Sequence, residues 1–162
     1  MTMQVVQTDI PAAQASAVAE TLALCELAPT ETEAGLLLIG SADPAQALAQ
    51  IAAFAAQRPA PARAGADTIA SGQVIWLMPE GTAARLKGAL QEAARSHAPQ
   101  LRVNAIHLGT LRPRPAPWQS AWGAAQPHPG SKPLPEALAE AIKFLLQVPS
   151  VTGQVVNVNP LV

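Results

Sequence analysis

The chain has 162 residues, of which 49% are hydrophobic and 13% are charged, with a formal net charge of −1 and a pI near 6.3. This balance argues against electrostatic binding to nucleic acid or to an anionic membrane, and 3% aromatic residues argue against a base-stacking platform. We find no apolar run of membrane-spanning length and no basic-then-apolar leader, so we expect no membrane association and a cytoplasmic location. The length suits one domain over 1–162.

Predicted strands and helices alternate in the first half of the chain. Residues 3–10 (MQVVQTDI) predict a short strand, and 12–27 predict an amphipathic helix. The apolar run 35–40 (GLLLIG) is typical of a strand buried on both faces, as in a parallel sheet. A helix is predicted over 41–57, and the Pro-, Ala- and Gly-rich segment 58–72 is expected to be a connection.

The second half continues the alternation. Residues 72–79 (GQVIWLMP) predict a strand, 81–99 a helix, and 101–109 (LRVNAIHLG) a strand. The clearest amphipathic helix is 134–147, and 153–160 (GQVVNVNP) predicts the last strand.

The fold class follows from this order of elements. Strand–helix units repeated five times imply a three-layer α/β domain, with a mostly parallel five-stranded sheet flanked by helices. The segment 112–135 holds seven prolines, which exclude a regular helix or a central strand there. We therefore expect a Pro-rich loop at 112–135.

The residue types that bind metals or form disulfides are sparse. Cys25 is the single cysteine and lies in an apolar helix, so we expect a small buried thiol without a disulfide. His97, His107 and His128 do not have a metal-ligand spacing, so no metal site is expected. Asn104 is expected to satisfy backbone groups near its strand.

Two long stretches carry a resemblance to a known family. LRVNAIHLG followed by TLRP resembles the "I-R-V-N-x-I-x-P-G-x-I-x-T" strand and loop of short-chain dehydrogenases/reductases. AIKFLLQVPSVTGQVVNVNP (141–160) resembles their ending, "A-x-x-F-L-x-S-x-x-S-x-x-T-G-x-x-x-x-V-D-G". GQVIWLMP and GLLLIGSA are similar to the family strands that end in "N-I-S-S" and "N-N-A-G", and MQVVQTDI to an earlier strand that ends in Asp. The resemblance implies a shortened Rossmann-like domain.

The chain departs from this family where the family's chemistry lies. Met78 and Pro79 stand at the catalytic Ser, Ala83 at the catalytic Lys, and the chain has no Tyr. Leu108 and Pro113 replace the Pro and Thr of the cofactor loop, and no Gly-rich turn precedes the strand 3–10 in this alignment. We therefore expect no catalytic residues, no NAD(P) cofactor and no enzymatic activity.

The family's strand order, 3-2-1-4-5-6-7, implies a rearranged sheet here. If the first two strands are missing, the strand 3–10 should move beside 35–40 and give five strands in sequence order. The alternative is that 3–8 is detached or pairs with a partner chain.

The preferred functional hypothesis is a non-catalytic subunit, a pseudoenzyme, that associates with an active reductase homologue or with itself. The resemblance implies contacts through the last helix and strand, and a Pro-rich loop with two tryptophans is a second candidate surface. The interface candidates are Trp118, Trp122, Leu138, Ile142, Phe144, Leu145, Val156 and Val158.

Two alternatives remain open. One is a homodimeric binding protein for a nucleotide or an acyl-CoA-type ligand, held in a remnant cleft lined by Gly40, Ser41, His107 and Gly109. The other is a divergent NAD(P)-dependent reductase that uses His107 or an arginine pair.

Overall fold

The computed structural model of the protein describes residues 3–30, 34–60, 62–64, 67–108 and 132–158. The elements in chain order are β1 (Met3–Thr8), α1 (Ala12–Leu24), β2 (Leu27–Pro29), β3 (Leu36–Ile39), α2 (Pro44–Ala56), β4 (Ala62–Ala64), β5 (Asp67–Ile69), β6 (Gly72–Met78), α3 (Ala83–Ser96), β7 (Leu101–Leu108), α5 (Leu134–Gln147) and β8 (Val155–Val158).

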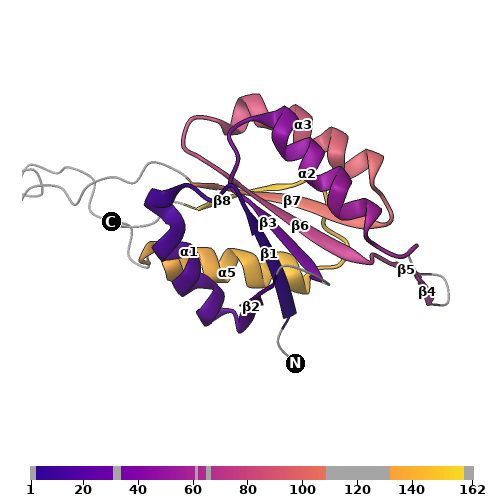
Figure 1. The fold of residues 1–162 in the computed structure, drawn as a ribbon, viewed down its shortest axis with the longest axis horizontal. Coiled ribbons are helices and arrows are strands. Elements are labelled where there is room, and N and C mark those ends of the chain that lie inside the picture. The colour runs from indigo at the N-terminus through magenta and orange to yellow at the C-terminus, as the bar shows by residue number, and fades with distance from the viewer. Residues whose placement is uncertain (1–2, 31–33, 61, 65–66, 109–131, 159–162) are drawn as a thin grey trace, which may run out of the picture.

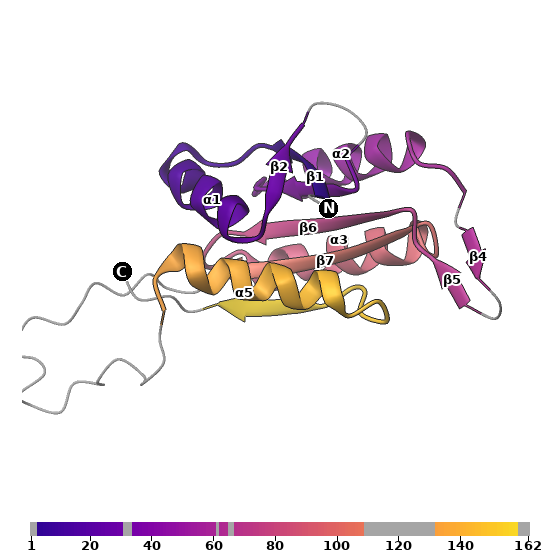
Figure 2. The same cartoon turned by 90° about the horizontal axis from the view of Figure 1, so that it is seen from below.

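A parallel six-stranded sheet forms the middle layer, in the order β2-β1-β3-β6-β7-β8. α1 and α5 cover one face and α2 and α3 cover the other, as Figures 1 and 2 show. The α/β class and the three layers are therefore as the sequence predicted. The count of five strands is corrected to six, because the short segment β2 pairs along the outer side of β1.

The position of β1 differs from the one that the sequence resemblance implied. β1 does pair directly with β3, as predicted, with Val5 opposite Leu36 and Thr8 opposite Ile39. Its other neighbour is the strand that follows it in the chain, so β2-β1-β3 reproduces the 2-1-4 part of the family order. β1 therefore takes the place of the family's first strand. The segment that corresponds to the Gly-rich turn is 9–11, between β1 and α1.

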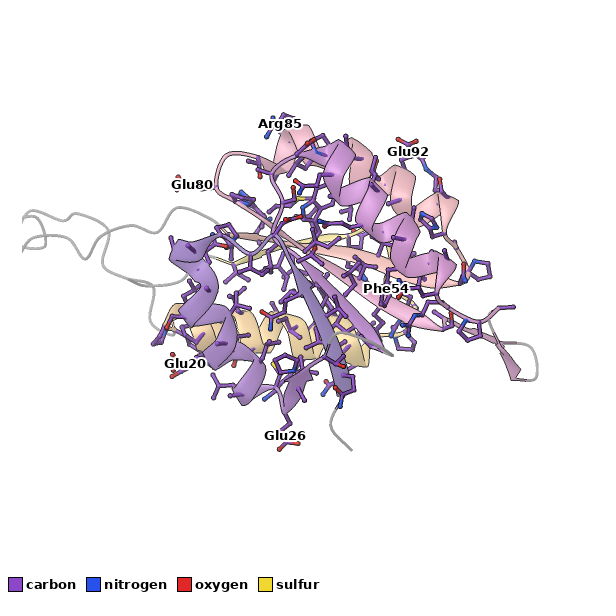
Figure 3. The ribbon with its side chains drawn as sticks, viewed as in Figure 1. Glu20, Glu26, Phe54, Glu80, Arg85 and Glu92 are labelled. Atoms are coloured by element: carbon purple, nitrogen blue, oxygen red, sulfur yellow. The ribbon has the colours of Figure 1, made fainter. Side chains whose placement is uncertain are left out.

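Alternating side chains of the central strands explain why their sequences are apolar throughout. On β3, Leu37 and Ile39 join the core beneath α2 and α3, whereas Leu36 and Leu38 join the core beneath α1 and α5. β6 alternates in the same way, and all five of its residues from Val74 to Met78 are at most 1% exposed. Such strands must be apolar on both faces. Phe54 fills the space between α2 and the sheet (Figure 3).

Polar side chains of β7 fasten the segment that leads into β8. The Asn104 Nδ2 donates to the Val151 carbonyl at 2.9 Å, and the Asn104 Oδ1 accepts from the Gln154 N–H at 3.1 Å. Arg102 Nη1 donates to the Val148 carbonyl at 3.0 Å, and burial lowers the pKa of this guanidinium. The predicted role of Asn104 is confirmed: it is 3% exposed and satisfies two backbone groups.

Two further observations concern the remaining segments. The connection predicted over 58–72 contains the antiparallel pair β4–β5, with Arg63 opposite Thr68. Within the described ranges, every helix is too short or too polar to span a lipid bilayer. The Pro-rich loop expected at 112–135 lies outside the described residues, apart from its last part.

Candidate functional site

Between β1 and β3 the order of the strands reverses, and the helices that follow these two strands lie on opposite faces of the sheet. The segment after β1 leads to α1 on one face, and the segment after β3 leads to α2 on the other, although β1 and β3 are neighbours. In doubly wound sheets, ligands bind in the crevice at the carboxyl ends of such strands. The segments 9–11 and 40–43 are therefore the first candidate site.

Gly40 closes this crevice. A Cβ placed on Gly40 would lie 2.7 Å from the Asp9 carbonyl oxygen, 2.9 Å from the Ile10 Cα and 2.9 Å from the Pro11 Cδ. The Gly40 N–H also donates to the Thr8 carbonyl at 3.0 Å. The two segments are thus in direct backbone contact, and no group fits between them at this point.

Gln50 of α2 bridges the same two segments. The Thr8 hydroxyl donates to the Gln50 Oε1 at 2.7 Å, and the Gln50 Nε2 donates to the Asp9 carboxylate. Asp9 has a φ of +52°, a conformation in which Asp is more frequent than most residues. The end of β1 therefore presents a carboxylate held by an amide from α2.

Ser41 and Asp43 organise the start of α2 rather than an open cleft. The Asp43 side chain accepts from the Ala45 N–H at 3.0 Å, as an N-cap does. The Ser41 hydroxyl donates to Gln46 Oε1 at 3.0 Å and accepts from the Asp43 N–H at 3.1 Å. The Ser41 carbonyl accepts from the Trp76 indole at 2.7 Å. The segment 39–42, which stands where the family has "N-N-A-G", is thus held by hydrogen bonds to the start of α2 and to β6.

His107 lies away from Gly40 and Ser41. It is the last but one residue of β7, and β6 lies between β7 and β3 in the sheet. Its Nδ1 is 3.1 Å from the Asn157 Oδ1, opposite it on β8, whereas its Nε2 is buried and has no hydrogen-bond partner in the described part of the chain. The structure thus separates the predicted cleft residues into two groups, and Gly109 lies outside the described residues.

An open groove of about 470 Å³ lies between α3 and β8. The α3 side supplies Ala83, Ala84, Lys87 and Gln91, and the β8 side supplies Gly153, Gln154, Val155 and Asn157. The groove exists because α2 flanks α3 on one side, while β8 extends beyond α3 on the other. Sequence reasoning missed this groove, although Ala83, Lys87 and Gln91 do share one helix face by their i, i+4 spacing.

The predicted interface residues of the last helix and strand divide by burial. Leu138, Ile142 and Leu145 are each 1% exposed and pack against the chain's own sheet. Val158 is 7% exposed and Val156 is partly buried in the same core. Phe144 is 49% exposed, so it is the member of this set that the helix presents to its surroundings. Trp118 and Trp122 lie outside the described residues.

Cys25 is half-buried at the end of α1, where its thiol donates to the Ala139 carbonyl at 3.6 Å. Burial raises the pKa of this thiol, and the nearby Lys143 ammonium lowers it by a smaller amount. A protonated thiol is a poor nucleophile. Across the described ranges, His, Cys, Asp and Glu side chains form no cluster of three that could hold a metal ion.

Comparison with known proteins places the fold among reductases. No protein-family model matches the sequence, and no curated protein sequence does. The structure resembles the crystal structure of the FolM alternative dihydrofolate reductase 1 from Brucella canis complexed with NADP, with a TM-score of 0.62 and 16% identity over 97% of this chain and 92% of that chain. A short-chain dehydrogenase/reductase (glucose/ribitol dehydrogenase) from Brucella melitensis aligns with a TM-score of 0.46 and 15% identity over 98% of each chain. The chain thus has a Rossmann-like fold, as the likeness to the FolM reductase shows.

Two expectations from the sequence are corrected by this likeness. We expected no NAD(P) cofactor and no enzymatic activity, because family motifs are missing. The fold, however, matches that of an enzyme crystallised with NADP over almost the whole of both chains. Missing motifs are therefore no ground for excluding a cofactor or catalysis. The match spans 92% of that chain, so it does not show the shortening that the sequence resemblance implied.

The residues at the β1–β3 crevice do not fit the pyrophosphate of a dinucleotide. A pyrophosphate in this fold rests on backbone N–H groups of a Gly-rich turn at a helix N-terminus. Here the turn is Asp9-Ile10-Pro11, which offers a carboxylate and a proline, and Gly40 packs directly against it. A nucleotide would have to be held by other residues of this chain.

Proposed function

We propose that this chain is a subunit of reductase-like fold that associates with a second copy of itself through the face formed by α1 and α5. The observation that carries this proposal is the position of the exposed apolar side chains. Leu24 on α1 and Phe144 on α5 are the large hydrophobic residues that the described structure leaves exposed, at 42% and 49%. Single exposed apolar residues are ordinary, but two on adjacent helices favour an interface.

Both side chains lie on helices that cover the same face of the sheet. α1 and α5 pack side by side, with the Thr21 hydroxyl donating to the Pro135 carbonyl at 3.2 Å. Lys143, next to Phe144, lies close enough to Cys25, next to Leu24, to lower its pKa. The α1–α5 face thus carries one exposed large apolar side chain on each of its helices.

Charge on this face supports a second copy as the occupant. Lys143 is exposed on α5, and Glu20 and Glu26 point away from α1 and its carboxyl end (Figure 3). A two-fold interface places the same patch against itself, so a patch with both signs can pair each charge with its opposite. A partner with a different sequence, such as an active reductase homologue, is the other outcome of the test.

Replacing Phe144 with glutamate is expected to weaken self-association at least about thirtyfold, the effect of losing a central aromatic anchor. Folding should be unaffected, because the side chain is half exposed. Sedimentation of the purified protein over a range of concentrations measures the dimer dissociation constant. Phe144→Leu is the matched control and should retain the dimer. A wild-type protein that remains monomeric would contradict self-association, and co-purification with a reductase would indicate the hetero-oligomer instead.

A second candidate function is nucleotide binding, which the likeness to a reductase complexed with NADP favours. We expect NADP to bind with a measurable heat in isothermal titration calorimetry of the purified chain. NAD and acetyl-CoA, titrated in parallel, test whether recognition depends on the extra phosphate or on the adenine nucleotide that all three share. Absence of heat with every ligand would exclude this candidate and leave the oligomer proposal intact.

A further inference from the structure

We propose that the groove between α3 and β8 binds a phosphate-bearing small molecule of about mononucleotide size. The groove is on the opposite face of the sheet from the proposed dimer surface, and it is distinct from the closed crevice at β1 and β3. The inference gives the nucleotide candidate a location, and it can fail without affecting the dimer.

Size and shape suit a small ligand. The volume of about 470 Å³ lies within the range of small-molecule sites, which is roughly 300–1,000 Å³. The helix α3 forms one wall, and the strand β8 with its lead-in turn forms the other. The turn is fastened to the sheet by the Gly153 N–H, which donates to the Val103 carbonyl at 2.7 Å.

The charge of the lining selects an anion. Lys87 is the charged side chain among the lining residues, and no carboxylate accompanies it there. In the described part of the chain, the single ion pair is that of Lys132 with Glu140, on a different element. The Lys87 ammonium is therefore free to bind a phosphate, for which a lysine is a common partner.

The other polar groups suit the remainder of such a ligand. Gln91, Gln154 and Asn157 bring three amides, each able to donate and to accept, into the same groove. Hydroxyl groups and ring nitrogens of a nucleoside are ligands that amides recognise. Ala83, Ala84 and Val155 supply small apolar surface between these polar groups.

His107 provides an independent indication of a missing partner. Its Nε2 is buried without a hydrogen bond in the described part of the chain, and an unsatisfied buried nitrogen is destabilising. Its Nδ1 contacts Asn157, which lines the groove. The imidazole thus lies behind Asn157, with one ring nitrogen that the described part of the chain leaves unpaired.

The polarity of the lining favours a small molecule over a docked helix. Four of the eight lining residues are Lys, Gln or Asn. The core of a protein–protein interface is depleted in charged residues, and a buried lysine without a counter-charge would weaken it. A small anion satisfies the ammonium and leaves the amides accessible.

Backbone NMR of the full chain, titrated with adenosine 5′-monophosphate, inorganic phosphate and adenosine, tests the proposal. We expect the monophosphate to shift the amide signals of 83–91 and 153–157, inorganic phosphate to shift a subset, and adenosine to bind at least about tenfold more weakly because it lacks the charged group. Lys87→Gln should weaken binding of the monophosphate by about tenfold or more. Lys132→Gln, an equal change of charge outside the groove, should leave it unaltered.

The outcomes separate this site from the functions proposed above. The groove is excluded if none of the probes shifts those signals, if adenosine binds as tightly as its monophosphate, or if Lys87→Gln binds like the wild type. Calorimetric binding of NADP that Lys87→Gln does not weaken would keep nucleotide binding and exclude this location. Retention of the dimer in Lys87→Gln, measured by sedimentation, shows that the two surfaces act separately.

Discussion

Replacing Trp76 with alanine is expected to lower the free energy of unfolding by about 3–5 kcal/mol. Trp76 is fully buried at the centre of the sheet, on a strand with neighbours on both sides. The substitution leaves a cavity beneath α2 and α3 and removes the donor to the Ser41 carbonyl. Domains of this size are stable by about 5–15 kcal/mol, so the variant should unfold at much lower urea concentration than the wild type. Far-ultraviolet circular dichroism during urea denaturation measures the change.

Trp76→Phe separates the two contributions. It retains most of the buried ring and deletes the indole N–H, so the expected loss is about 1–3 kcal/mol, the cost of the unpaired carbonyl and the smaller ring. This milder variant also remains measurable if Trp76→Ala does not fold. A loss below about 1 kcal/mol for Trp76→Ala, beneath the range for buried aromatic truncations, would contradict the described packing.

Replacing Gly40 with alanine should lower the free energy of unfolding by about 1–3 kcal/mol, the usual cost of overpacking. The added methyl group would meet three atoms of the 9–11 segment within 3 Å. Two of these belong to the backbone, which cannot rotate away as a side chain can. Thermal and urea denaturation, followed by circular dichroism, measure the loss.

Gly88 of α3 is the matched control, because a Cβ there meets nothing within 4 Å in the described structure. In a helix interior, Gly→Ala raises stability by about 0.5–1 kcal/mol. The same chemical change should therefore have opposite signs at Gly40 and Gly88. A stabilised Gly40→Ala protein would show that β1 and β3 are not closely packed at their carboxyl ends.

Much of the fold was predictable because local pattern and tertiary environment agree. The apolar runs at 35–40 and 72–79 can be satisfied only by strands covered on both faces. β2 was not predictable in this way. It is three residues long and ends in Pro29, so it forms because β1 offers an unpaired edge. This pairing places β1 between β2 and β3. Because β2 was not predicted, the correspondence expected for residues 3–10 was wrong.

The candidate sites were less accessible to sequence reasoning. Gln50 lies 41 residues from Asp9, and Lys87 lies 70 residues from Asn157, so neither pairing leaves a local pattern. Periodicity predicts which face of a helix is buried. Whether the residues beside that face line a groove depends on which element packs next to the helix. The groove at α3 arises because none of the described helices covers β8 on that face. We expected lost cofactor binding because the family's motifs are missing. Those motifs describe one way of binding a nucleotide, and the fold permits others.

β8 is held in the sheet by fewer contacts than the central strands are. β6 has a neighbouring strand on each side and helices on both faces. β8 has one neighbouring strand, and hydrogen bonds of Asn104 and of the turn at Gly153 attach its lead-in segment to that strand. Segments with fewer partners open at lower free energy than the centre of a domain. The centre of the sheet is thus held more firmly than its edge at β8, and α5 and the groove both contact β8. A ligand in the groove, or a partner bound to α5, would therefore restrict the motion of β8.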